Sequence, residues 1–238
     1  MCTSLISNRN KTIVGWNLDI LDMEHRVRES DEGVYIEIND STEGWLPLFG
    51  ANNQGGFVGM PTCWPFDERS NPKNNETNII NLDIDYLLKK KTFIEVKDYV
   101  ENNKIASIPG VTFMSQLSNI NDDVLQIIPG QGFKYYEHPK YKVLTNFSPF
   151  KGTSEKHPWM GEDRYQKATN MLENANDDFD VEECFDILKS VAQDVCPTVV
   201  SMDYDVTEKI VYWCENQRWS TIIKHEFEKW KIIFLNCL

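Results

Sequence analysis

The fold is decided by the first 19 residues, MCTSLISNRNKTIVGWNLD. Residues 3–7 and 12–18 are rich in β-branched and apolar side chains, and the segment between them, residues 8–11, is typical of a turn. This pattern predicts a β-hairpin at the N-terminus. The hairpin places Cys2 at the start of its first strand and Asp19 at the end of its second strand.

The register of this hairpin decides which side chains share a face with Cys2. If all four turn residues lie outside the ladder, Cys2 faces Asn17, and Asp19 is its diagonal neighbour on the same face. A slip of one residue would instead turn Trp16 toward Cys2, because side chains alternate between the two faces of a strand. The sequence is compatible with both registers.

Beyond the hairpin, alternating and apolar runs predict further strands, and apolar residues three and four apart predict helices. We expect strands at residues 34–38, 57–60, 110–116, 124–128, 133–136, 142–145, 197–204 and 210–214. We expect helices at residues 82–88, 93–100, 163–174 and 181–193, the second opening with a Thr92–Glu95 capping box. This order predicts a single α+β layered domain over residues 1–238, with mostly antiparallel sheets.

The composition argues against several classes of function. The 238 residues carry 24 basic and 37 acidic side chains, a net charge of −13, which disfavours broad contact with nucleic acid or a membrane surface. No run approaches the roughly 18 apolar residues of a membrane span, and the N-terminus lacks the features of a secretory signal. The six cysteines and four histidines are dispersed without zinc-like spacing. We therefore expect a cytoplasmic protein without metal or cofactor.

Cys2 is the first candidate for chemistry because of its position. An initiator Met before a small residue is normally removed, which would leave a cysteine with both a thiol and a free α-amine. Such an amine has an unperturbed pKa of about 7.7–8.0, so it can act as general base for its own thiol. No histidine partner is then needed. On position alone, a small apolar residue opening an edge strand is the commoner explanation.

Three further polar residues could support that thiol. Asp19 could hold the α-ammonium or orient the thiol, or it could simply end a strand. Asn146, where a predicted strand breaks into a loop, could donate to an oxyanion or form an Asx turn. Arg164 opens a predicted helix, where the helix dipole disfavours a cation, so it either serves the site or pairs with a neighbouring acid. Each pair of alternatives stays open at this level.

The order of these residues along the chain resembles the choloylglycine hydrolase family of linear amide hydrolases, which includes bile salt hydrolases and penicillin V acylases. The resemblance spans nearly the whole chain. The segments that carry it are MCTS (1–4), GWNLD (15–19), GANNQGG (50–56), KVLTNFSP (142–149), DRY (163–165), YD (204–205) and IVYW (210–213).

The resemblance implies a four-layer αββα sandwich of the N-terminal-nucleophile type. It implies that Cys2 is nucleophile and N-terminal base and that Asp19 binds the α-amine. Asn146 would donate to the oxyanion through its side-chain amide, a backbone N–H near Thr62 would be the second donor, and Arg164 would lie beside the thiolate. The implied reaction is hydrolysis of a small-molecule N-acyl amide, linear and non-peptide, through an acyl-thioester.

Two residues depart from the family pattern and leave other functions open. Trp16 stands where the family usually has an arginine near the sulfur, so the thiol should be less acidic and one substrate contact is lost. Thr62 stands where the family tends to have Asn or Tyr, although a backbone donor survives that change. An acyltransferase using an amine acceptor and a catalytically silent binding protein are the alternatives. The resemblance also leaves a homo-oligomer open.

Overall fold

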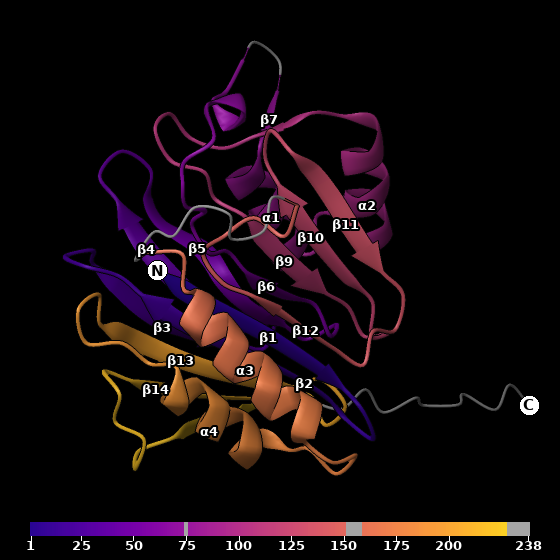
Figure 1. Cartoon of the computed structure of the whole chain (residues 1–238), viewed down its shortest axis with the longest axis vertical. Coiled ribbons are helices and arrows are strands. Elements are labelled where there is room, and N and C mark those ends of the chain that lie inside the picture. Colours follow the sequence, from indigo (N-terminus) through magenta and orange to yellow (C-terminus); the bar gives the residue numbers. More distant parts are fainter. Residues whose placement is uncertain (74–75, 151–158, 228–238) are drawn as a thin grey trace, which may run out of the picture.

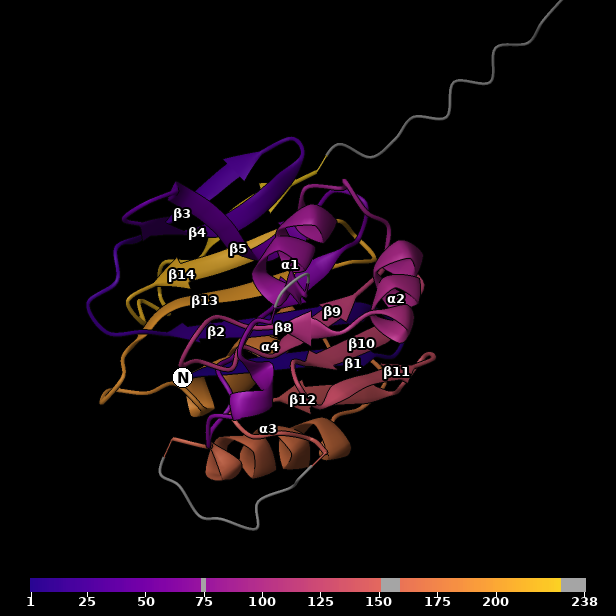
Figure 2. The ribbon, with the colours of Figure 1, turned by 90° about the horizontal axis from the view of Figure 1, so that it is seen from above.

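Two β-sheets stacked face to face form the centre of the molecule (Figure 1). The computed structural model describes residues 1–73, 76–150 and 159–227. In this part of the chain, one pair of helices covers the outer face of each sheet, which gives four layers in the order αββα (Figure 2).

The first sheet is built around the N-terminal hairpin. In order across the sheet, its described strands are β12 (Tyr141–Leu144), β1 (Cys2–Asn8), β2 (Thr12–Asp19), β13 (Thr198–Asp205), β14 (Ile210–Glu215) and β15 (Ile223–Glu226). All neighbours in this sheet are antiparallel. Strands from the beginning, middle and end of the chain therefore meet beside the N-terminus.

The second sheet is also antiparallel throughout. In order across the sheet, its described strands are β11 (Gly132–Tyr136), β10 (Val124–Ile128), β9 (Ser115–Ser118), β6 (Phe57–Gly59), β5 (Gly44–Asn52), β4 (Gly33–Asp40) and β3 (His25–Ser30). A short parallel pair, β7 (Thr77–Asn78) and β8 (Ile105–Ala106), lies outside both sheets.

Four α-helices in the described chain complete the layers. They are α1 (Ile79–Leu87), α2 (Phe93–Asn102), α3 (Glu162–Asn174) and α4 (Val181–Ser190), with a short 3₁₀ turn, η1 (Glu68–Ser70). The capping box of α2 is present: Thr92 N–H donates to the Glu95 carboxylate at 2.8 Å, and Glu95 N–H donates to Thr92 Oγ1 at 3.2 Å. No helix in the described ranges is long and apolar enough to span a membrane.

Apolar side chains fill all three spaces between the layers. Ile6 and Trp16 of the first sheet meet Phe49 of the second sheet between the two sheets. Leu5, which follows the opposite alternation in β1, packs under α3 and α4. Val96 of α2 packs against the outer face of the second sheet. The predicted α+β sandwich with mostly antiparallel sheets is confirmed, and the single domain over residues 1–238 stays a prediction.

The predicted strand at residues 110–116 is largely wrong. Residues 110–114 make only isolated bridges, and β9 begins at Ser115. Gly110 adopts a φ of 77°, which an extended strand does not tolerate. Strands β3, β5 and β15 and the two short strands β7 and β8 were missed. The β3 segment is rich in charge because it is a sheet edge, and β5 contains Pro47, which sits at a register shift against β4.

The four-residue turn expected in the N-terminal hairpin is also wrong. Asn8 pairs with Thr12, so only residues 9–11 form the loop. The ladder is shifted by one residue, and Cys2 lies opposite Leu18. Trp16 consequently shares the face of Cys2 that points into the space between the sheets, while Asp19 lies on the opposite face, toward the helices.

Candidate active site

The N-terminus lies where the β1–β2 hairpin opens (Figure 1). Cys2 is 5% exposed, and its backbone N–H donates to Asn146 Oδ1 at 2.8 Å. The Met1 ammonium donates to the main-chain oxygen of Asp19 at 2.7 Å and to Cys196 Sγ at 3.8 Å. Burial lowers the pKa of this ammonium, but Cys2, Asp19 and Cys196 together outweigh burial, so the net effect is a raised pKa.

Asn146 is held by its main chain and by both ends of its side-chain amide. Its backbone N–H donates to Met160 O at 3.0 Å. Its Nδ2 donates to Thr62 O at 2.6 Å and to Thr62 Oγ1 at 3.1 Å, while Oδ1 accepts from Cys2. The amide therefore links the start of β1 to the loop that carries Thr62.

Arg164 reaches into the same place from the first turn of α3. Its Nη1 donates to Cys2 O at 2.7 Å and to Thr3 Oγ1 at 2.9 Å, and its Nη2 donates to Asn146 Oδ1 at 2.9 Å. The side chain is only 5% exposed. Gly161 makes this possible, since a Cβ there would lie 2.2 Å from Arg164 Nη2 and the residue has a φ of 68°.

Asp19 lies beside this guanidinium. Its Oδ2 lies 3.7 Å from Arg164 Nη1 and accepts from Gln193 Nε2, and its Oδ1 accepts from Thr198 Oγ1 at 2.6 Å. Burial raises the pKa of Asp19 to about 6, although Arg164 acts in the opposite direction. Sequence reasoning missed Gln193 and Thr198. The β2–β13 pairing, which sets Thr198 opposite Asp19, is the signal that would have found the threonine.

The Cys2 thiol lies in a less polar setting than its neighbours. Burial raises its pKa to about 11, and the N-terminal ammonium and Arg164 only partly oppose this. Trp16, on the same face, is fully buried and stacks on Phe49 with ring centroids 5.2 Å apart. A raised thiol pKa agrees with the expectation from Trp16, and burial is its largest cause. A substrate contact by Trp16 stays a prediction.

The backbone of Thr62 is turned toward Asn146. In the bridge between Thr62 and Phe113, Cys63 N–H donates to Thr112 O at 2.6 Å and Met114 N–H donates to Pro61 O at 2.7 Å. In this antiparallel pattern the N–H and C=O of Thr62 itself point away from Phe113. The C=O accepts from Asn146 Nδ2, and the Thr62 N–H has no hydrogen-bond partner within the described ranges.

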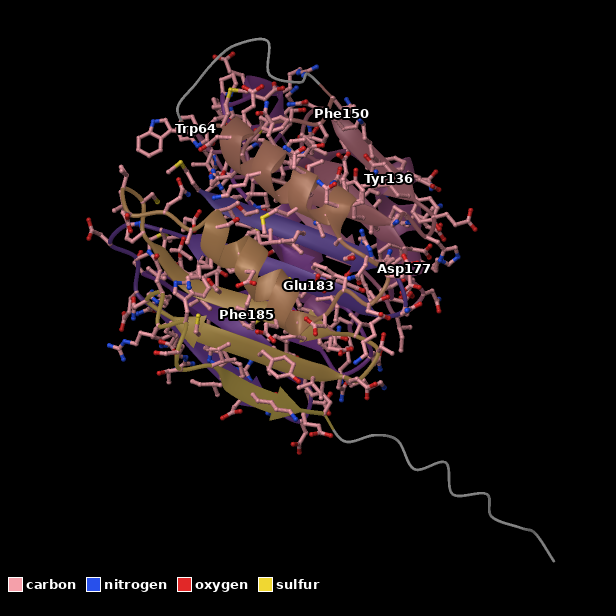
Figure 3. All side chains as sticks on the ribbon, turned by 60° about the horizontal axis from the view of Figure 1, so that its bottom comes forward. Trp64, Tyr136, Phe150, Asp177, Glu183 and Phe185 are labelled. Atoms are coloured by element: carbon pink, nitrogen blue, oxygen red, sulfur yellow. The ribbon has the colours of Figure 1, made fainter. Side chains whose placement is uncertain are left out.

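The surface around these residues is aromatic in part. Trp64, whose backbone N–H donates to Asn146 O at 2.7 Å, is 37% exposed and projects from the surface (Figure 3). Thr145 and Phe147, on either side of Asn146, line a cavity of about 630 Å³. The described residues contain no group of three or more His, Cys, Asp or Glu side chains that could hold a metal.

The structure thus brings together five of the six residues singled out from the sequence. Cys2, Asn146 and Arg164 contact one another directly, Asp19 lies beside Arg164, and Thr62 binds the Asn146 amide. The sixth residue, Trp16, is part of the core between the sheets. What each residue does in a reaction stays a prediction.

Comparison with known proteins identifies the fold. No protein-family model matches the sequence, and no curated protein matches it. The C2A mutant of conjugated bile acid hydrolase from Clostridium perfringens matches with a TM-score of 0.67 over 95% of this chain and 92% of that chain, at 16% identity. Penicillin V acylase from Agrobacterium tumefaciens gives 0.66 over 95% and 86%, at 13% identity. A Caenorhabditis elegans ortholog of N-acylethanolamine-hydrolyzing acid amidase gives 0.59 over 86% and 93%, at 18% identity.

The chain therefore has the fold of the N-terminal-nucleophile hydrolases. Its sandwich is similar to those of conjugated bile acid hydrolase, penicillin V acylase and the acid amidase ortholog, over most of each chain. This likeness agrees with the fold that the sequence motifs imply.

Proposed function

We propose that this chain hydrolyses a linear amide through the thiol of Cys2 once Met1 has been removed. The observation that carries the proposal is that Arg164 donates to both Cys2 O and Asn146 Oδ1. Its Nη1 also lies 3.7 Å from Asp19 Oδ2. An almost fully buried cation of this kind is costly unless it is paired. Its partners here are the groups that an N-terminal nucleophile needs.

Removal of Met1 would turn the Cys2 nitrogen into a primary amine. That nitrogen is 2.8 Å from Asn146 Oδ1. Asn146 Oδ1 would accept a hydrogen bond from the amine and so fix the direction of the amine's lone pair. Burial of Cys2 raises the pKa of its thiol and so disfavours the thiolate. The proton must therefore pass from the sulfur to the α-amine as the sulfur attacks the substrate carbonyl.

Attack would place a negative charge on the substrate oxygen. The Thr62 N–H and one hydrogen of Asn146 Nδ2 are the two donors on the same side of the site. Asn146 Nδ2 makes two hydrogen bonds to Thr62. The one to Thr62 Oγ1, at 3.1 Å, is the longer and the easier to exchange for a hydrogen bond to an oxyanion. Preorganised donors of this kind are worth roughly 3–4 kcal/mol each.

Breakdown of the tetrahedral adduct would return the proton. The α-ammonium gives it to the leaving nitrogen, the C–N bond breaks, and a thioester to Cys2 remains. Water then attacks the thioester, with the α-amine accepting its proton, and releases a carboxylic acid and the free thiol. The neighbouring proteins named above support hydrolysis of an amide by this scaffold.

The test uses protein produced in cells and analysed by intact mass. We expect a mass one Met lighter than the full sequence, and a Cys2-dependent burst of amine from an N-acyl amide such as an acyl p-nitroanilide. Cys2→Ala should lower turnover by roughly 10⁴-fold or more. Cys184→Ala, which removes a buried thiol on α4, is the matched control and should retain turnover. Turnover that persists in Cys2→Ala would contradict the proposal.

One observation favours a second candidate, a binding protein on the same scaffold without turnover. Trp16 fills the Cys2 face of the hairpin, and burial keeps the thiol protonated. If Met1 is fully retained in protein made in cells, the α-amine never forms and this second candidate is favoured. Acyl transfer to an added amine is distinguished from hydrolysis by product analysis.

A further inference from the structure

A cavity of about 630 Å³ lies between the free edges of the two sheets. Strand β12 is the edge of the first sheet and β11 is the edge of the second, and α3 closes the third side (Figure 2). We refer to this cavity as the edge groove. Its lining includes Lys134 and Tyr136 of β11, Lys142 of β12 and Tyr165 of α3.

The charges in the edge groove are mostly positive, although the chain as a whole has a net charge of −13. Three lysines and one glutamate line it: Lys134, Lys140, Lys142 and Glu173. Lys140 lies 4.0 Å from the Asp177 carboxylate, and Glu173 accepts from the Tyr141 hydroxyl at 2.7 Å. Lys140 is the most exposed of the three lysines, and Glu173 is the one acid among the described lining residues. Both already have a polar partner.

The other two lysines have no acidic partner in the described chain. Lys134 Nζ donates to Pro149 O at 2.9 Å, and Lys142 Nζ lies 4.0 Å from the centre of the Tyr136 ring. Burial, followed by repulsion from Lys134, lowers the pKa of Lys142. Two neighbouring ammonium groups without a carboxylate are unfavourable in a partly buried place unless an anion joins them.

The edge of β12 adds hydrogen-bond donors. Asn8 N–H donates to Lys140 O at 2.9 Å, and Lys142 is paired with Ile6. Because the hydrogen bonds alternate along an antiparallel ladder, the N–H groups of Tyr141 and Val143 point away from β1. Both residues line the edge groove, so these donors face its interior.

The remaining walls are largely apolar and aromatic. Phe147 and Tyr165 form an edge-to-face pair with ring centroids 5.1 Å apart, and both line the groove. Tyr136, the last residue of β11, also lines the groove, and Figure 3 labels its position. A small inorganic anion would use the lysines and leave these walls empty, whereas an anion with an apolar body would use both.

We propose that the edge groove binds an organic carboxylate with an apolar body. The carboxylate lies between Lys134 and Lys142, and the body runs along the free edge of β12 toward Phe147. Lys142 lies opposite Ile6 and Leu144 lies opposite Ser4, and β12 ends at Leu144, two residues before Asn146. The carboxylate therefore lies beside the first half of β12, and Asn146 lies beyond the last residue of that strand. This inference does not depend on the proposed amide hydrolysis.

Isothermal titration of the full chain with decanoate, below its micelle concentration, tests the proposal. We expect saturable binding that Lys142→Met and Lys134→Met each weaken by about tenfold or more, because each removes a charge-assisted contact. Lys142→Arg should keep most of the affinity. Lys97→Met is the matched control, since Lys97 also lies over a tyrosine ring, 5.2 Å from the centre of Tyr135, but outside the edge groove.

The probe molecules separate the two halves of the proposal. Decan-1-ol should bind much more weakly than decanoate, and inorganic phosphate should not displace decanoate at equal concentration. Equal binding of the alcohol would show that the lysines do not select a carboxylate. Displacement by phosphate would show a simple anion site. Each of these two outcomes would overturn the inference. So would the absence of saturable decanoate binding, or an unchanged affinity in Lys142→Met.

Discussion

The two faces of the N-terminal hairpin are both buried, yet they carry opposite chemistry. The face toward α3 and α4 holds Thr3 and Asp19, which belong to a hydrogen-bonded cluster centred on Arg164. The face toward the second sheet holds Cys2 and Trp16 within an apolar core. We call these the charged face and the thiol face.

The difference shows how a strand can separate a thiol from a neighbouring charged cluster. Alternation places neighbouring side chains on opposite faces, so Asp19 cannot lie on the same face as Cys2. Arg164 joins the two faces because it binds the Cys2 carbonyl and the Asn146 amide oxygen, both near the end of the strand. The charged face thus contacts the thiol-bearing residue through its main chain and through the Asn146 amide.

Breaking the link between the faces should have the largest effect. Arg164→Met leaves the Asp19 carboxylate buried without its cation, and we expect the free energy of unfolding to fall by about 3–5 kcal/mol. Urea denaturation measures this loss. The double variant with Asp19→Asn should recover part of it, because the uncompensated charge is then gone. A loss below about 1 kcal/mol in the single variant would mean that the pairing carries little stability.

Removing the charge from the charged face should change how stability depends on pH. The native pKa of Asp19, about 6, is above its ordinary value of 3.8, so the folded chain binds the proton more tightly than the unfolded chain. This group therefore stabilises the fold at low pH, and that contribution is lost as the pH rises from about 4 to about 6, by roughly 3 kcal/mol.

Asp19→Asn should remove that part of the slope. The measurement is the difference in unfolding free energy between wild type and variant, by urea denaturation at a series of pH values. Asp177→Asn changes an exposed acid and should keep the wild-type slope. If Asp19→Asn and the wild type run parallel between pH 4 and 6, the native pKa of Asp19 is not raised.

The thiol face should tolerate its conservative change best. Trp16→Phe keeps a ring against Phe49 and removes an indole N–H that has no partner in the described chain. The cost of the lost buried volume and the gain from removing an unpaired donor should nearly cancel in the free energy of unfolding. We expect a stability change within about 1 kcal/mol. Turnover of the amide substrate should change little. A KM raised tenfold with unchanged stability would instead show that Trp16 contacts substrate.

Much of the fold follows from local sequence signals. The N-terminal hairpin, the Thr92 capping box and the two helices that follow Gly161 all have patterns that neighbouring residues determine. The sequence left the hairpin register open because the register depends on whether Asn8 belongs to the strand or the turn. That choice rests on hydrogen bonds to residues far away in sequence, including the bond from Asn8 N–H to the main-chain oxygen of Lys140, which directly precedes β12.

The candidate site divides in the same way. Cys2, Asp19, Asn146 and Arg164 were found because their order resembles a known family. Gln193 and Thr198, which hold the Asp19 carboxylate, were missed because an amide and a hydroxyl at a helix end and a strand start are common everywhere. Their role appears only when β13 pairs with β2.

The hydrogen bond from the Cys2 nitrogen to Asn146 Oδ1 has a consequence for maturation. A side-chain oxygen accepts equally well from a planar peptide N–H and from an amine. Cleavage after Met1 would therefore leave this contact in place while converting a non-basic nitrogen into a base. The precursor and the processed protein would share one shape, and processing would switch on chemistry in a site that is already assembled.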